Sequence, residues 1–363
     1  MKNCWLEIDY NQIKTNLKII KDYVGDTKKL ICVVKNNSYG HDLIDTAVAL
    51  LEAGADMLAV VKMDSAVKLR NSGIKHPILL ISPFDKSQLS EAIDNDIILS
   101  VTDDDFPEVF TSLKNEIKNR LKLQIQINTG MNRHGISPYK LHDIFHYIMN
   151  HDKLDLTGIY SNSSSTTTAE AEYKLFISSL SSLEGLPSKL LCHFGNSASI
   201  LKFPLTILDG ARFGILSFGI FPHDDVPVNL AIRPAVSWKA RVNSIRTVKA
   251  GDNIGYMGKF EITKDTKIAI VSTGYGYGYL RKFINGEGTV LINGKKCKLA
   301  SPPNMNDIMV ILDDNNCKVG DEVVLLGKQK NEEITIYELA KRLDTIEAEV
   351  LCLMQQTTEI IRK

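Results

Sequence analysis

Short apolar runs alternate with amphipathic segments from about Leu30 to Phe218. The runs are rich in β-branched residues, which is typical of strands buried on both faces. The strands that this pattern predicts span residues 30–35, 56–61, 77–82, 97–101, 123–127, 154–160, 190–193 and 207–211. The segments between them have a helical period, for example residues 43–55 and 64–72. Alternating strands and helices indicate parallel β/α units, and eight of them predict a (β/α)8 barrel of the TIM type, with a doubly wound open sheet as the alternative.

The pattern changes after Pro222. The segments SWKARVNSI, KIAIVSTGYG, TVLINGKKCKLA and EVVLLG alternate polar and apolar residues and are separated by glycine turns, which predicts a mostly β second domain. We place the boundary between residues 222 and 229, which divides this α/β chain into a barrel (1–225) and a β-rich domain (226–363). Residues 1–10 are a candidate strand for the second domain. The Ser- and Thr-rich segment 161–172 predicts a loop that caps a helix.

Composition narrows the range of functions. The chain of 363 residues has 43 Lys plus Arg and 43 Asp plus Glu, so no excess charge attracts nucleic acid or an anionic membrane, and we expect neither as a partner. No apolar run is long enough for a bilayer span, and the start MKNCWLEIDY lacks a signal-peptide core, which favours a cytoplasmic protein. The six cysteines form no C-x-x-C pair and predict free thiols, and no cluster of His and Cys predicts a metal site.

One lysine stands out at the end of the first predicted barrel strand. Lys35 closes the run LICVVK and is followed by NNSYGHD, a position where lysine is uncommon unless it has a role. Functional residues of TIM barrels follow the carboxyl ends of the strands, and a lysine amine can bind an aldehyde cofactor covalently. The alternative is a lysine that extends from the barrel mouth into solvent.

Further candidates follow later strands. Arg133 in NTGMNRHG could hold a carboxylate, or could be an ordinary surface arginine. In HFGNSAS, Asn196 and Ser197 are typical of a helix start that binds phosphate, whereas His193 is equally compatible with a core position. Gly214 in RFGILSF would allow the backbone to approach a phosphate closely.

In chain order, the segments VVKNNSYGH, NTGMNRHG, HFGNSAS, ARFGILSFG and TGYGYGYLR resemble the motifs of the alanine racemase family. The similarity extends from WLEIDY near the start to TIEAEVLC near the end. It implies a barrel followed by a β domain, pyridoxal 5'-phosphate as cofactor, a small amino acid as substrate, and a homodimer with shared active sites. The implied reaction is the conversion of L-alanine to D-alanine by two bases.

The resemblance also assigns roles to individual residues. Lys35 would carry the cofactor and act as the base on one face of the substrate, and Tyr275 of the partner subunit would act on the other. Without the resemblance, Tyr275 could equally be an aromatic packed in a glycine-rich turn. Arg212 would face the pyridine nitrogen, or else form a structural ion pair. The cofactor would be bound by Lys35, Tyr39, His193, Asn196, Ser197, Arg212, Gly214 and Ile215, and the substrate by Arg133, Met305 and Asn162.

Several positions depart from the family pattern on the substrate side. Gln126 replaces a lysine that is usually carbamylated, and Asn162 replaces a histidine that usually links the catalytic tyrosine to the arginine at 212. Other departures are Asn128, Tyr277, Asn304 and, less securely aligned, Gln355. They leave three alternatives open: a racemase of serine or a longer amino acid, an amino-acid decarboxylase, and a pyridoxal-phosphate-binding protein without turnover.

Overall fold

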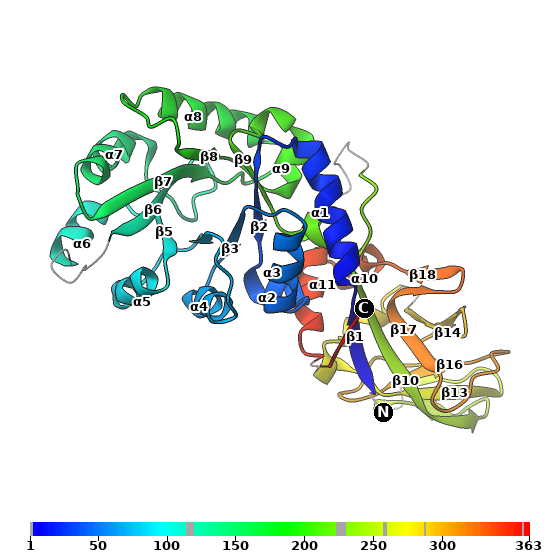
Figure 1. Ribbon diagram of the computed structural model, residues 1–363. Helices are drawn as coiled ribbons and strands as arrows, with labels where there is room; N and C mark the ends of the chain where they lie inside the picture. Colours follow the sequence, from blue (N-terminus) through cyan, green and yellow to red (C-terminus); the bar gives the residue numbers. More distant parts are fainter. Residues whose placement is uncertain (1–2, 114–119, 223–229, 257–259, 287, 358) are drawn as a thin grey trace. The chain divides into compact units, whose positions relative to one another are not determined.

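The computed structural model describes residues 3–113, 120–222, 230–256, 260–286, 288–357 and 359–363. The chain forms two compact units, one of Asn11–Arg233 and one of Met1–Tyr10 with Pro234–Lys363. The boundary predicted at residues 225 and 226 lies outside the described residues. Each unit has its own strands and helices (Figure 1).

The first unit is a closed barrel of parallel strands, which confirms the predicted fold and makes the open-sheet alternative wrong. The barrel closes where the last strand pairs with the first, with Ile31 opposite Arg212. In barrel order the strands are β2 (Lys29–Val33), β3 (Met57–Val60), β4 (Ile78–Leu80), β5 (Ile97–Val101), β6 (Leu121–Ile127), β7 (Leu154–Ser161), β8 (Leu191–His193) and β9 (Gly210–Phe213).

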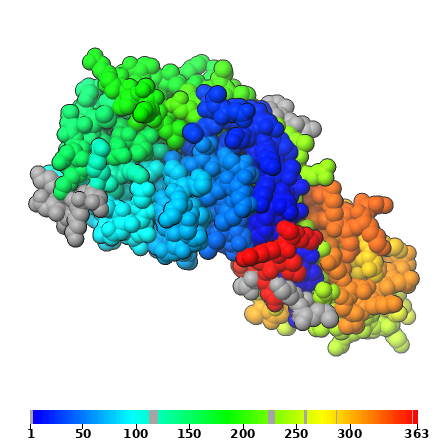
Figure 2. Space-filling model, viewed as in Figure 1, coloured from blue at the N-terminus to red at the C-terminus, as the bar shows by residue number. Residues whose placement is uncertain are grey.

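Helices cover the outside of this barrel (Figure 1). Amphipathic α1 buries one stripe of side chains, including Ile13, Leu17 and Ile20, and leaves its other face on the surface, where Figure 2 shows it in dark blue. The helices of the barrel unit are α1 (Tyr10–Val24), α2 (Lys35–Gly40), α3 (Leu43–Glu52), α4 (Met63–Asn71), α5 (Leu89–Asp94), α6 (Phe106–Leu113), α7 (Leu141–Met149), α8 (Ala169–Ser181) and α9 (Ser197–Lys202).

Most predicted strand ends differ from the observed ones by one to three residues, and two of these differences have a clear local cause. The first strand ends at Val33, because the chain enters the turn of α2 at Lys35. The last strand begins at Gly210 rather than at residue 207, because a 3₁₀ turn at Pro204–Thr206 occupies the preceding segment. The apolar residue Ile207 follows this turn and lies outside the strand.

The inside of the barrel is filled by side chains from successive strands, as expected for this architecture. The interior core contains Ile31, Val33, Met57, Ala59, Leu79, Ile98 and Tyr160, with Ile81 and Leu191 packed against it. Tyr160 is the polar member of this group and is 2% exposed. Its hydroxyl therefore needs hydrogen-bond partners inside the barrel.

The second unit is mostly β, as predicted. Among the described residues its main sheet has nine strands, and β1 pairs antiparallel with β10 and parallel with β19. The strands are β1 (Cys4–Ile8), β10 (Val236–Val248), β13 (Thr266–Val271), β14 (Thr289–Ile292), β15 (Lys295–Lys298), β16 (Ile308–Ile311), β17 (Glu322–Gln329), β18 (Glu332–Ile334) and β19 (Ile360–Arg362). The pair β11 (Asn253–Ile254) and β12 (Phe260–Glu261) and the helices α10 (Ile336–Leu343) and α11 (Glu347–Met354) complete the unit.

The described helices of the two units include none that is both long and apolar enough to cross a membrane. All six cysteines are free thiols, and four of them are buried.

Candidate active site

The turn that follows β2 has an unusual backbone. Four consecutive residues, from Asn36 to Tyr39, have φ between 50° and 54°, in the left-handed region. This conformation costs roughly 1–2 kcal/mol for each L-residue, although asparagine tolerates it better than most. Such strain persists only where surrounding contacts fix it, and it is common at functional sites.

His41 fixes the end of this turn. Its Nδ1 lies 3.1 Å from the carbonyl oxygens of both Ser38 and Tyr39, so this nitrogen carries the proton and donates. The ring stacks on Phe218, with ring centroids 4.4 Å apart. Burial lowers the pKa of His41 to about 4, so the imidazole is neutral at physiological pH. The turn is thus held by a neutral, buried ring.

Lys35 begins the turn and is half-buried. Its Nζ lies 5.8 Å from the ring centroid of Tyr39, within the range of a cation–π contact. The Tyr39 ring packs in turn on Phe218, at 5.4 Å between centroids. The strained turn therefore places the lysine amine and the tyrosine side by side at the carboxyl end of the first barrel strand.

Tyr39, Ser197 and Gly214 converge from three separate segments. A Cβ added to Gly214 would lie 2.5 Å from the Tyr39 hydroxyl, so only glycine fits this close approach. The Gly214 N–H donates to Ser197 Oγ at 3.2 Å. Hydroxyl and backbone N–H groups are the donors that bind phosphate in proteins, and the predicted phosphate-binding residues are thus brought together. Ile215 follows directly and is buried.

Asn196 positions Ser197. Its side-chain oxygen accepts hydrogen bonds from the backbone N–H groups of Ala198 and Ser199, which makes it the N-cap of α9. Those two N–H groups are therefore already bonded. A ligand at this end of the helix would rely on the Ser197 hydroxyl rather than on the helix N–H groups.

Arg212, His193 and Gln124 form a buried chain across the barrel. An Arg212 Nη1–H donates to His193 Nδ1 at 2.7 Å, and His193 Nε2 lies 2.9 Å from Gln124 Oε1. Because arginine only donates, Nδ1 must be the bare nitrogen and Nε2 must carry the proton. Burial and the Arg212 charge hold the pKa of His193 well below its usual value. Burial also lowers the pKa of Arg212, to about 10, so the arginine stays charged beside a neutral histidine.

The charge of Arg212 is solvated by backbone and amide oxygens. Its Nη2 donates to the carbonyl oxygens of Gly195 (2.6 Å) and Ser161 (2.9 Å) and to Asn162 Oδ1 (3.2 Å). No carboxylate pairs with it within the part of the chain that the structure describes, so the described residues give no support to the alternative of a structural ion pair. A buried cation without a counter-charge is costly, which points to a functional role.

Asn162 and Gln126, two substrate-side positions of the barrel unit, bond to Arg212 and to its neighbour Tyr160. Asn162 Nδ2 contacts Met131 Sδ at 3.1 Å while its oxygen binds Arg212. Gln126 Oε1 accepts from the Tyr160 hydroxyl at 3.1 Å, and Gln126 Nε2 donates weakly to the His134 carbonyl at 3.3 Å. Two departures from the family pattern are thus neutral amides that bond to neighbouring polar groups.

Arg133 is exposed at this mouth of the barrel. It is close enough that its charge helps to lower the pKa of Arg212, after the larger effect of burial. Burial raises the pKa of Tyr160 to about 12, against the opposing effects of its Ser100 hydrogen bond and of both arginines. The site therefore combines a buried and an exposed cation, suited to an anionic substrate group.

Tyr275 and Met305 belong to the second unit, where two loops hold them together. The Tyr275 N–H donates to the Asn304 carbonyl at 3.0 Å, and the Gly276 N–H donates to the Met305 carbonyl at 2.8 Å. A Cβ at Gly274 would lie 2.2 Å from the Asn304 oxygen, so this contact requires glycine. Met305 is 55% exposed, and Tyr275 is half-buried. The Tyr277 carbonyl accepts from the Thr357 hydroxyl, and Gln355 ends α11.

Gln124, Tyr160 and His41 were not predicted from the sequence as site residues. The sequence pattern could have identified Gln124. It and Gln126 occupy alternate positions of the apolar strand LKLQIQI, so their side chains point to the same face. Two amides directed into a barrel need polar partners there. The partners themselves, Tyr160 and His193, lie on strands that only the folded barrel brings close.

Comparisons with known proteins agree over nearly the whole chain. The family model "Alanine racemase, N-terminal domain" matches residues 8–222, and "Alanine racemase, C-terminal domain" matches residues 235–361. An alanine racemase of Desulforamulus reducens is 33% identical over 359 residues, covering 96% of this chain and 95% of that protein. Alanine racemase 1 of Bacillus subtilis is 32% identical over 360 residues, covering 97% and 90%.

Solved structures of alanine racemases also superimpose on nearly the full length of this chain. The alanine racemase of E. faecalis superimposes with a TM-score of 0.94 at 28% identity, over 100% of this chain and 98% of that one. The alanine racemase of Bacillus anthracis, solved with bound L-Ala-P, gives a TM-score of 0.90 at 30% identity, over 98% and 93%. The barrel and the β unit are the two domains that the family models describe, and the relatives match over nearly the full chain. The chain therefore belongs to the alanine racemase family of pyridoxal-phosphate-dependent isomerases.

Proposed function

We propose that this protein interconverts L- and D-alanine with pyridoxal 5'-phosphate bound at the carboxyl end of the barrel. The observation that carries the proposal is the buried Arg212 cation, which bonds to the neutral His193 ring and to Asn162. Both named relatives are alanine racemases, and the similarity covers nearly all of each chain. The alanine of their names gives the substrate that we propose here.

The described residues fit this cofactor. Lys35 supplies an amine for its aldehyde, and the hydroxyls of Tyr39 and Ser197 with the backbone at Gly214 and Ile215 supply donors for its phosphate. The close approach at Gly214 is what supports the phosphate assignment, because a Cβ there would fill the space beside the Tyr39 hydroxyl. Pyridoxal phosphate, when bound, withdraws electrons from the α-carbon of an amino acid and so weakens its C–H bond.

The protein moves the proton. Lys35 Nζ acts on one face of the α-carbon and the Tyr275 hydroxyl on the other, each taking or returning one proton. The Arg212 guanidinium keeps its proton at neutral pH. It would therefore donate a hydrogen bond to the pyridine nitrogen without protonating it. Catalysis therefore depends more on two well-placed bases than on a strong electron sink. Arg133 holds the substrate carboxylate by a charged hydrogen bond.

Tyr275 and Met305 reach the active site from the partner subunit of a homodimer. What supports this arrangement is the family resemblance and the fact that both residues lie in a unit separate from the barrel residues. Each dimer then contains two composite sites related by twofold symmetry.

The reaction is tested by incubating the cofactor-loaded protein with single L- and D-amino acids in heavy water. We expect deuterium at Cα of alanine, with inversion of configuration from either enantiomer. Release of carbon dioxide would instead indicate a decarboxylase. Rapid inversion of serine or a longer amino acid, with alanine unchanged, would identify a racemase of different specificity. Cofactor binding without any exchange would leave a non-catalytic protein.

Replacement of Gly214 by alanine is expected to weaken cofactor binding by about 10- to 100-fold, the equivalent of one or two lost hydrogen bonds to a charged group. The added methyl would lie 2.5 Å from the Tyr39 hydroxyl, which must move away. The dissociation constant is measured from cofactor absorbance during titration of the apoprotein. A double-mutant cycle with Tyr39→Phe provides the control: removal of the hydroxyl relieves the clash, so the two effects should not add. Additive losses would contradict this explanation.

Replacement of Asn162 by histidine is expected to raise alanine turnover by about 10-fold, part of what a well-tuned base supplies. An imidazole at this position can still accept from Arg212 and can also support Tyr275 as a base. L-alanine should show the larger Cα-deuterium isotope effect in the unmodified protein, because Tyr275 takes the proton in that direction. The variant should reduce this difference.

Asn162→Ala is the matched control, because it removes the Arg212 contact without adding an imidazole. Its turnover should not exceed that of the unmodified protein. If Asn162→His leaves alanine turnover at background while another amino acid is consumed rapidly by the unmodified protein, Asn162 is a substrate contact in a site with a different specificity.

A further inference from the structure

A pocket opens at the end of the barrel opposite the candidate active site. Its lining residues lie at the amino ends of β2, β3, β4, β8 and β9, whereas Lys35, Ser197 and Gly214 follow carboxyl ends. All barrel strands are parallel, so these amino ends meet at one end of the barrel. The pocket has a volume of about 520 Å³, in the range of small-molecule sites.

The floor of the pocket is apolar. Met57 and Leu191 line it, and both also pack in the interior core of the barrel. Pro77 adds an exposed apolar wall. A ligand with an apolar body would remove this surface from water at roughly 25 cal/mol per Å² of apolar area.

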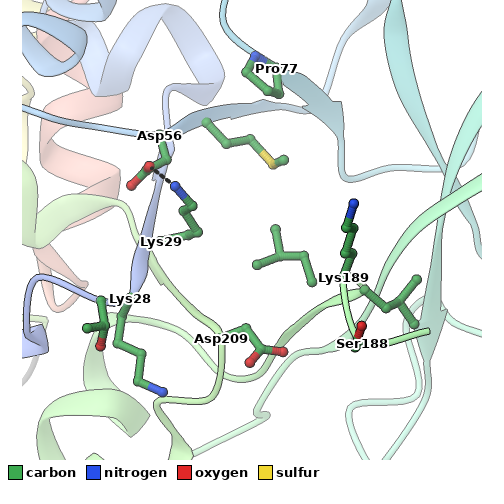
Figure 3. Close-up of a pocket in the computed structure, with 11 residues that line it drawn as sticks. Lys28, Lys29, Asp56, Pro77, Ser188, Lys189 and Asp209 are labelled. Atoms are coloured by element: carbon green, nitrogen blue, oxygen red, sulfur yellow. Dashed lines mark hydrogen bonds and ion pairs between the residues drawn. The ribbon is translucent and has the colours of Figure 1, made fainter. Parts of the chain in front are cut away.

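The two carboxylates of the pocket already have partners. Asp56 Oδ1 pairs with Lys29 Nζ at 2.8 Å, and Asp56 Oδ2 accepts from the Leu30 N–H at 2.9 Å. Asp209 Oδ2 accepts from the Cys192 N–H at 3.0 Å. Both acids thus satisfy backbone groups at the starts of strands, which is a structural role. Figure 3 shows Lys29 directed toward Asp56.

Two further lysines of the pocket have no such partner. Lys28 is half-buried and Lys189 is exposed, and neither has a carboxylate within ion-pair distance among the residues that the structure describes. Lys189 lies on the opposite side of the pocket from Lys28 and Lys29 (Figure 3). The pocket therefore joins an apolar floor to an excess of positive charge. A lysine amine is a compact charge that binds phosphate and carboxylate groups.

We propose that this pocket binds a small organic anion, with an apolar body on Met57 and Leu191 and a phosphate or carboxylate group held by the amine of either Lys28 or Lys189, which lie on opposite sides of the pocket (Figure 3). The site is separate from the racemase site and does not depend on the proposed reaction. Asp56 and Asp209 limit binding to ligands whose charged group lies toward one of these two lysines, because an anion near either carboxylate would be repelled.

The test uses the protein loaded with pyridoxal phosphate and then freed of excess cofactor by gel filtration, so that the active-site phosphate donors are occupied while the proposed pocket is not. Three fluorescent probes that share a naphthalene ring are titrated: 1-naphthyl phosphate, 1-naphthoate and the uncharged 1-naphthol. We expect saturable binding of at least one anion, about 10-fold tighter than that of naphthol, as for one added charged hydrogen bond. The phosphate and carboxylate probes distinguish which group the lysines prefer.

Variants then locate the bound probe. Lys28→Gln with Lys189→Gln should weaken the anion about 10-fold and leave naphthol unchanged. Leu191→Phe, which fills the floor, should weaken all three probes. Lys86→Gln changes an exposed lysine of the barrel unit outside the pocket and should have no effect. Racemase activity should be retained in all of them, because none of these residues lies in the candidate active site.

Three results would overturn the proposal: no saturable binding, equal affinity for naphthol and the anions, or an unchanged affinity in the double-lysine variant. If Leu191→Phe does not fold, hydrogen exchange of the unmodified protein gives an independent answer. The anion should protect amides at 27–30 and 188–191. Protection at 35–41 and 195–215 instead would place the probe in the active site.

Discussion

Lys35→Ala is expected to lose covalently attached cofactor and to reduce racemisation by about 10⁴-fold or more. The amine has two roles in the proposed mechanism, attachment of the aldehyde and proton transfer, and a positioned base alone contributes roughly 10²–10⁴-fold. No other lysine follows the carboxyl end of β2 within the strained turn at Asn36–Tyr39. The unmodified protein should therefore be yellow when loaded, and the variant should lose this colour on dialysis.

Borohydride reduction followed by peptide mapping identifies the attached lysine. We expect the label on Lys35 in the unmodified protein. Lys62 offers a matched control, because it also follows the carboxyl end of a barrel strand, β3, and begins the next helix as its N-cap. Lys62→Ala should keep both label and activity. A label on another lysine, or none, would contradict the assignment of Lys35.

The barrel could be predicted because its signal is local. Each buried strand is a short apolar run, and the alternation of eight such runs with helical segments has few other solutions. The errors came where local signals were misleading. Ile207 is apolar but follows a 3₁₀ turn, and Lys35 continues an apolar run but begins a left-handed turn. No apolar pattern predicts a left-handed backbone at non-glycine residues, because His41 and Phe218 stabilise it only in the folded chain.

The residues of the candidate site also fall into two groups, those that could be predicted from the sequence and those that could not. Arg212, Ser197 and Gly214 could be identified as candidates because each follows a predicted strand. Their partners could not, because a hydrogen bond such as His193 to Gln124 joins residues 69 positions apart. The family resemblance linked position 162 to Arg212, and the structure places Asn162 Oδ1 3.2 Å from Arg212 Nη2. What Gln126 does in place of a charged residue became visible only with its Tyr160 contact.

Tyr275→Phe is expected to reduce racemisation by about 10²–10⁴-fold, the contribution of one positioned base. The substitution removes only the hydroxyl, so the ring and the backbone contact to Asn304 remain. Cofactor attachment at Lys35 should persist, which separates this variant from Lys35→Ala. Tyr277 lies two residues away in the same turn, and Tyr277→Phe is the matched control that should stay active. Equal losses in both variants would indicate a structural effect of the turn rather than a base.

Mixing the two inactive variants tests whether the sites are shared between subunits. A hybrid dimer of Lys35→Ala and Tyr275→Phe subunits would contain one site with both substitutions and one with neither, if each site takes Lys35 from one subunit and Tyr275 from its partner. Random exchange at equal concentrations makes half of the dimers hybrids, so activity should return to roughly a quarter of the unmodified level. Native mass spectrometry measures the hybrid fraction. If hybrids form and activity stays at background, Tyr275 does not act across the dimer, and the second base must come from within the same subunit.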